Sequence, residues 1–179
     1  MWSAFMLKLA VAAAATATLV FASGSALADT AGASFQVKMT IVRSCAVTAG
    51  SASDISLGTS VQPTATNQTG NNTISVTCSK TTPYTVGLLP SSTNGGTTDG
   101  TGAMSSVANS ATNTDKVPYA LYSNAGNSTV WGNTTGTGAN VVGGTGTGAA
   151  ITHTVYAKNT NANFTPDSYA DTVTVTVTY

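Results

Sequence analysis

A strictly alternating segment near the start of the chain constrains the fold more than any other feature. Apolar Ala33, Phe35, Val37, Met39 and Ile41 are each separated by one polar residue. Because successive side chains of a strand point to opposite faces, these five apolar side chains share one face. The segment is therefore predicted to be a strand whose apolar face inserts into an apolar groove.

The last residues of the chain form a second alternating segment. Val173, Val175, Val177 and Tyr179 alternate with threonines, so a second strand is predicted to run to the final residue. A domain that ends its sheet with such a strand, and carries an unpaired strand at its front, favours strand exchange between neighbouring copies.

Residues 1–28 are predicted to be a secretory signal that is removed. Lys8 gives a weakly positive start, and Leu9–Ala22 is an apolar run. This run is shorter than the roughly 20 residues that span a bilayer. Ala26–Ala28 offers a small-residue cleavage site before Asp29. An uncleaved anchor would need a longer apolar run, so export with cleavage is expected.

The remaining residues, 29–179, are enough for one domain with one core. They carry five Lys and Arg against six Asp and no Glu, a formal net charge of −1. Nucleic-acid binders show clustered basic residues, and membrane-surface binders show a basic amphipathic helix. The sequence has neither pattern, so no nucleic-acid or membrane-surface partner is expected.

Both cysteines, Cys45 and Cys78, follow the predicted signal. Export places them in an oxidising compartment, where a disulfide is expected. The alternative is a metal site, but two thiolates and the single histidine, His153, lack a fourth zinc ligand unless an Asp contributes. No metal and no cofactor are expected.

The sequence predicts an all-β fold, because β-branched residues fill the apolar runs and Gly, Asn, Thr and Ser separate them. The number of short strands indicates an immunoglobulin-like β-sandwich. Thr93–Gly102 and Gly132–Gly148 are predicted to be surface loops, and Pro166-Asp167 a turn. Beyond the leading segment, strands are expected at residues 44–48, 55–58, 73–79, 84–89, 104–108, 117–123, 129–132, 150–158 and 169–179.

No catalytic residue is predicted. A nucleophile needs a positioned base, and His153 lies on the apolar face of its predicted strand, which favours a packing role. Asp167 and Asp171 are close in sequence, but a turn role explains Asp167. The glycine-rich Gly143–Gly148 lacks the lysine of a P-loop. We therefore expect no enzyme and no small-molecule substrate.

Four motifs follow one another in the chain: Cys45-Ala46-Val47, Ile74–Cys78, Tyr119–Tyr122 and Tyr169–Tyr179. Together they resemble the spore coat protein U domain family, which includes subunits of archaic chaperone-usher pili of Gram-negative bacteria. The similarity covers essentially all of the chain after residue 28. Asp167 departs from it, since the family often has Gly before the Tyr-x-Asp ending.

The resemblance implies an incomplete immunoglobulin-like β-sandwich, completed by a donor strand from a neighbouring subunit. A periplasmic chaperone lends a strand first, and an outer-membrane usher then catalyses exchange for the next subunit's strand. Residues 29–42 would be the donor strand and 43–179 the pilin domain. Phe35, Val37, Met39 and Ile41 would fill the groove, with Ala33 at its margin. The groove and chaperone-binding strand would carry Val173, Val175, Val177 and Tyr179.

The resemblance thus implies a structural pilin subunit, exported through the periplasm to a surface fibre for adhesion and biofilm formation. Its partners would be identical or related pilins, the chaperone and the usher. Alternatives are a spore or surface coat protein, or a secreted carbohydrate-binding module in which an exposed Trp131 stacks on a sugar. The sequence leaves open major or minor subunit status, the surface bound, and whether the donor strand folds back into its own groove.

Overall fold

The computed structural model describes residues 29–179, so the predicted signal at residues 1–28 lies outside the described residues. The chain divides into two units between Met39 and Thr40. Residues 29–44 form neither helix nor strand. A strand is held by hydrogen bonds to a partner strand, so the strand expected at residues 33–41 remains a prediction about a complemented state.

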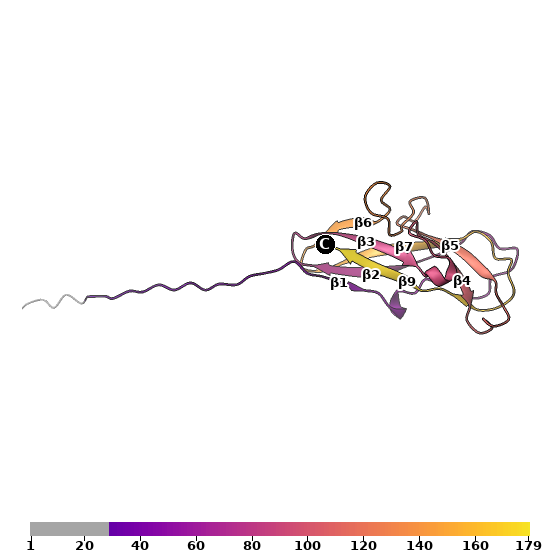
Figure 1. Ribbon diagram of the computed structural model, residues 1–179, viewed down its shortest axis with the longest axis horizontal. Coiled ribbons are helices and arrows are strands. Elements are labelled where there is room, and N and C mark those ends of the chain that lie inside the picture. Colours follow the sequence, from indigo (N-terminus) through magenta and orange to yellow (C-terminus); the bar gives the residue numbers. More distant parts are fainter. Residues whose placement is uncertain (1–28) are drawn as a thin grey trace, which may run out of the picture. The chain divides into compact units, whose positions relative to one another are not determined.

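The regular secondary structure of residues 40–179 is almost all strand, joined by turns and loops (Figure 1). Two three-residue 3₁₀ turns, η1 and η2, lie at Ser51–Ser53 and Ser92–Asn94. Within residues 29–179, no helix has the length and apolar character needed to cross a bilayer. The strands are β1 Cys45–Thr48, β2 Gln68–Cys78, β3 Pro83–Pro90, β4 Thr101–Ser106, β5 Lys116–Tyr122, β6 Val142–Thr145, β7 Ala150–Asn159, β8 Tyr169–Ala170 and β9 Val173–Thr178.

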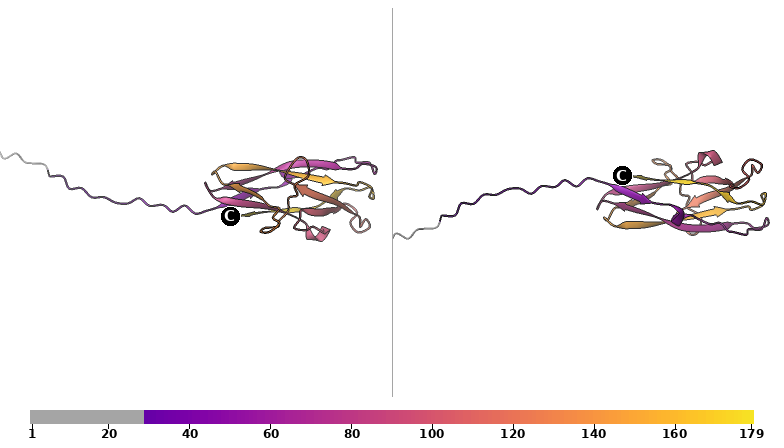
Figure 2. Two further views of the ribbon diagram at one scale, coloured as in Figure 1. Left: turned by 90° about the horizontal axis from the view of Figure 1, so that it is seen from above. Right: turned by 90° about the horizontal axis from the view of Figure 1, so that it is seen from below.

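The strands form two antiparallel sheets that pack as two layers (Figure 2). One sheet has six strands in the order β1-β2-β7-β5-β4-β8, and the other has three in the order β6-β3-β9. This arrangement confirms the predicted all-β, immunoglobulin-like sandwich. The two layers are unequal, and the small sheet ends at β9.

The pairing registers define two ends of the sandwich. Cys45 pairs with Cys78, so β1 begins where β2 ends. Thr85 pairs with Thr178, so β9 ends where β3 begins, close to the end of β2. We call this the root end, because the chain enters the sandwich there. Figure 1 shows the C-terminus at this end of the sandwich.

The core lies between the sheets and is made of aliphatic and aromatic side chains from both. Trp131 is 1% exposed, and its indole N–H donates to the Val86 carbonyl at 2.8 Å. Other core members are Ile74, Val76, Cys78, Tyr84, Leu88, Tyr119, Leu121, Val155 and Ala157.

Two of the predicted strands are not present as strands. Residues 55–58 form no strand, and residues 129–132 contribute only one bridge, between Val130 and Tyr122. Conversely, β6 forms inside the segment predicted to be a loop. Gly144 of β6 pairs with Tyr84 so closely that a Cβ there would overlap the tyrosine ring. The glycines that suggested a loop therefore permit a strand to lie against an aromatic side chain.

The predicted single strand at residues 169–179 is two strands in different sheets. β8 pairs with β4 in the large sheet, whereas β9 pairs with β3 in the small one. Asp171 lies between them. Its carboxylate accepts hydrogen bonds from the Tyr119 hydroxyl at 2.7 Å and the Asn94 amide at 2.7 Å, and from the Ser91 N–H at 3.3 Å. These bonds hold the chain where it changes sheets.

Candidate functional site: an open seam between the two sheets

The end strand of the large sheet lies beside the end strand of the small sheet. Among residues 29–179, β1 pairs only with β2, and β9 pairs only with β3. The two end strands are close neighbours, but no ladder joins them. We call the line along which they meet the seam, and we define it by Cys45 and Val47 of β1 and the three valines of β9.

The seam is lined by apolar side chains that the core covers only on one side. Val173, Val175 and Val177 pack against the core and remain partly exposed, while the threonines between them point outward and are exposed. Val47 of β1 is 37% exposed. An apolar face that stays half uncovered at a sheet edge is the surface that an added strand would bury.

The backbone of β9 also has an unused edge. Apart from its ladder with β3, β9 makes no backbone hydrogen bond within residues 29–179. In an antiparallel pair, alternate residues direct N–H and C=O away from the partner. One side of β9 thus presents donors and acceptors to a further strand.

The residues predicted to donate a strand are exposed. Phe35 is 88% exposed, Val37 89%, Met39 83% and Ile41 81%. A regular row of large exposed apolar side chains is uncommon on soluble proteins and marks a candidate interaction surface.

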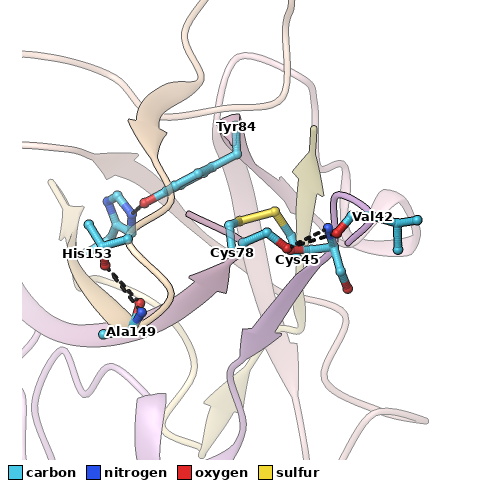
Figure 3. Close-up of a disulfide and its surroundings, with 9 residues drawn as sticks. Val42, Cys45, Cys78, Tyr84, Ala149 and His153 are labelled. Carbon is cyan, nitrogen blue, oxygen red and sulfur yellow. Dashed lines mark hydrogen bonds between the residues drawn. A yellow bond between two sulfur atoms is a disulfide. The ribbon is translucent and has the colours of Figure 1, made fainter. Parts of the chain in front are cut away.

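The root end is fixed by the disulfide. Cys45 and Cys78 are bonded, which confirms the predicted pair (Figure 3). Ser79, the next residue of the chain, holds the residues that precede β1. Its N–H donates to the Ser44 carbonyl at 2.9 Å, and its Oγ accepts from the Ser44 N–H at 3.1 Å. The Ser79 hydroxyl also lies 3.3 Å from the Val42 carbonyl.

His153 has the packing role predicted for it. Its Nε2 lies 2.9 Å from the Tyr84 hydroxyl, so the pair bridges the two sheets (Figure 3). The ring also packs edge-on against Trp131, with centroids 6.2 Å apart. Burial lowers the pKa of His153. The Tyr84 hydroxyl is the one side-chain hydrogen-bond partner of the ring among the described residues, so the arrangement is that of a side chain packed between the sheets.

Trp131 does not offer a sugar-stacking face. The sequence favoured a core position for it, and the structure places it in the core, 1% exposed. The carbohydrate-binding alternative, which required an exposed indole, is therefore not supported at this residue.

Asp167 organises the end of the sandwich opposite the root. Its carboxylate accepts from the Ser106 hydroxyl at 2.6 Å and from the amides of Asn109 and Asn113 at 3.1 and 3.0 Å. These three bonds lower the pKa of Asp167 to about 2. They tie the β4–β5 loop to the segment before β8, in addition to the predicted turn. A polar hollow of about 270 Å³ lies between these loops and includes Asp115.

No group of three or more His, Cys, Asp or Glu side chains within residues 29–179 is arranged to hold a metal ion.

Sequence reasoning found the valines of β9 and the cysteines but missed Val47 and Ser79. For Val47 a signal existed, since it lies two residues after Cys45 and therefore shares its face. For Ser79 there was none, because its role depends on a contact 35 residues away.

Comparisons with known proteins extend these findings. A family model described as the Spore Coat Protein U domain matches residues 31–176. No curated protein matches the chain. A similar solved structure is the CsuC–CsuE chaperone–tip adhesion subunit pre-assembly complex from archaic chaperone-usher Csu pili of Acinetobacter baumannii. That match has 21% identity and a TM-score of 0.49, and it covers 78% of this chain but only 41% of that one.

Proposed function

Because the chain belongs to the Spore Coat Protein U domain family, we propose that it is a structural pilin subunit that polymerises by donor-strand complementation. Residues 33–41 of one copy would lie in the seam of the next, beside β9. Backbone hydrogen bonds to the free edge of β9 would give affinity, and the alternating side chains would give specificity. The fibre would serve adhesion and biofilm formation.

The observation that carries the proposal is the match between the seam and the donor segment. The seam has half-covered valines at alternate positions of β9 and an unused backbone edge. Residues 35–41 have four large exposed apolar side chains at the same period of two. Burying four such side chains is worth about 6 to 12 kcal/mol before ordering costs. A joint of this kind would be stable, and a copy with an open seam would be poorly stable alone.

The proposal assigns partners and a route to the surface. Residues 1–28 would direct export, and a periplasmic chaperone would cover the seam with a strand of its own until an outer-membrane usher exchanges it for the next subunit's residues 33–41. Other partners would be identical or related pilins. The proposed role is structural and not catalytic, in keeping with the packing of the only histidine between the two sheets.

The test is to refold the oxidised chain from residue 29 and to run it unboiled on a denaturing gel beside a variant lacking residues 29–41. A ladder of heat-labile multimers that disappears with the deletion is expected. Monomers alone from both proteins would refute strand exchange and would favour the coat-protein alternative.

Two neighbouring substitutions sharpen this test. Val37→Asp puts a charge on the apolar face of the donor segment and should abolish the ladder. Lys38→Asp changes the polar face of the same segment and should leave the ladder in place. Because both variants carry a new aspartate in the same segment, loss of the ladder in both would mean that charge in this segment, and not its apolar face, controls assembly.

A further inference from the structure

We infer that the two ends of the sandwich attract each other between copies: Arg43 and Lys80 at the root end of one copy dock against Asp115 and Asp167 at the opposite end of the next. The inference rests on the proposed function and deepens it, because it names a surface that guides each new copy beside the donor segment. The partner of the root end is thus a second copy of this chain.

The root end carries a basic hollow. It has a volume of about 230 Å³ and lies between residues 41–43 and residues 79–82. Arg43 and Lys80 line it, and no carboxylate does. These are two of the four Lys and Arg residues in 40–179. The hollow therefore gathers half of the positive charge of the sandwich at the point where the donor segment leaves it.

Thr82 gives a second observation at the same place. It is 2% exposed and lines the hollow, yet its hydroxyl has no hydrogen-bond partner within residues 29–179. Polar groups buried to this degree are usually bonded. A hydroxyl donor beside two cations is suited to a carboxylate, which can accept from all three groups.

The opposite end of the sandwich is acidic. Asp115 and Asp167 line its hollow, and no Lys or Arg does. Hydrogen bonds from Thr165 lower the pKa of Asp115, and the pKa of Asp167 is also lowered, so both are charged at neutral pH. Lys116, which follows Asp115 in the chain, donates to Asn94 at 2.6 Å. Because Asp167 is already bound by three side chains, Asp115 has more capacity left to accept from a partner.

The proposed joint brings these two ends together. β9 begins at the opposite end and reaches the root end at Thr178. All strand pairs within residues 29–179 are antiparallel. A donor strand that pairs with β9 in the same sense ends with Ile41 beside Val173. Residues 42–44 then span at most about 10 Å before β1. The root end of the donor copy would therefore lie against the opposite end of the acceptor.

Charge favours this arrangement over its reverse. A donor strand parallel to β9 would bring Arg43 and Lys80 of two copies together, and like charges across an interface are unfavourable. The antiparallel arrangement places them near Asp115, just before β5, and Asp167, in the segment that leads into β9. Attraction between exposed charges mainly speeds association, and salt weakens it.

The test is a charge-swap cycle on the chain from residue 29, in which the rate of ladder formation is measured at about 0.01 M and about 1 M salt. Lys80→Asp and Asp115→Lys are made singly and together. Every joint contains both ends, so the double variant restores opposite charges throughout the polymer. Asp115→Asn removes the charge but keeps an acceptor for the loop. Lys158→Asp is the control, because it makes the same charge change on β7, away from the root end.

At low salt, each single reversal should slow ladder formation about three- to tenfold, and Asp115→Asn should slow it less. The double variant should recover most of the rate, and Lys158→Asp should match the wild-type chain. The differences should disappear at high salt, where the Debye length is about 3 Å. Single variants with the wild-type rate, or a double variant without recovery, would overturn the inference. Slowing by Lys80→Asp alone would also overturn it, since the root end would then take a different anionic partner.

Failure of the proposed function has a separate readout. It appears as the absence of a ladder from the wild-type chain, which would refute both strand exchange and this contact. A ladder that forms at a rate insensitive to these charges would leave strand exchange intact and refute the contact alone.

Discussion

Replacing Asp171 with alanine is expected to destabilise the sandwich at the point where the chain passes from one sheet to the other. The carboxylate receives hydrogen bonds from Tyr119, Asn94 and Ser91. Burial raises the pKa of the Tyr119 hydroxyl, and the hydrogen bond to Asp171 and its negative charge raise it further. The hydroxyl is therefore a protonated donor, and in the variant it would have no partner.

The magnitude follows from which of these groups water can reach. Tyr119 is 8% exposed, so losing its charge-assisted bond should cost about 2 kcal/mol. Asn94 and Ser91 are partly exposed, and water can replace Asp171 there at a cost of about 0.5 kcal/mol each. The free energy of unfolding should fall by about 3 kcal/mol.

Urea unfolding followed by the fluorescence of Trp131 measures this loss, since Trp131 is the one tryptophan after residue 28. Tyr119→Phe removes the hydroxyl and should cost about 1 kcal/mol. The double variant should lose clearly less than the sum of the two single losses, because the unpaired hydroxyl is gone. A loss below 1 kcal/mol for Asp171→Ala, or additive losses, would refute the reasoning.

Three further outcomes are expected. Replacing Cys45 and Cys78 together with alanine should cost about 3.7 kcal/mol in the chain-entropy model for a loop of this length, measured by urea unfolding; an unchanged midpoint would contradict it. Trp131→Ala should cost about 3 to 5 kcal/mol, and a stable variant would mean that the core tolerates the cavity. The Asp167 pKa of about 2 lies below its ordinary value of 3.8, so its contribution is present above pH 4 and lost as the pH falls toward 2. Asp167→Asn should flatten the pH dependence of stability in that window.

Runs of β-branched and apolar residues between turn-forming residues predicted the main strands. The strand expected at residues 150–158 corresponds to β7, and the one at 84–89 to β3. The break between β8 and β9 was not predicted, because it depends on tertiary hydrogen bonds to Asp171 that the local sequence pattern does not specify. β6 was missed because its two glycines resemble a loop until their contact with Tyr84 is known.

The parts of the candidate site that follow from side-chain alternation could be predicted from the sequence. The parts that depend on which strands lie side by side could not. The valines of β9 and the apolar residues of 33–41 follow from alternation alone. That β9 lies at a sheet edge beside β1 follows from the order of strands, which no local pattern specifies. The contact of Ser79 with Ser44 likewise exists only once β1 has paired with β2.

The position of the disulfide also has a mechanical meaning. If neighbouring copies are joined through residues 33–41, a pull along the fibre enters each sandwich just before Cys45 and would act first on the four-residue β1. The covalent bond to Cys78 passes that tension directly into the eleven-residue β2, which pairs along ten positions with β7. The pulling force would then act on the longest ladder of the domain, between β2 and β7. β1 could not separate from β2 while the disulfide is intact.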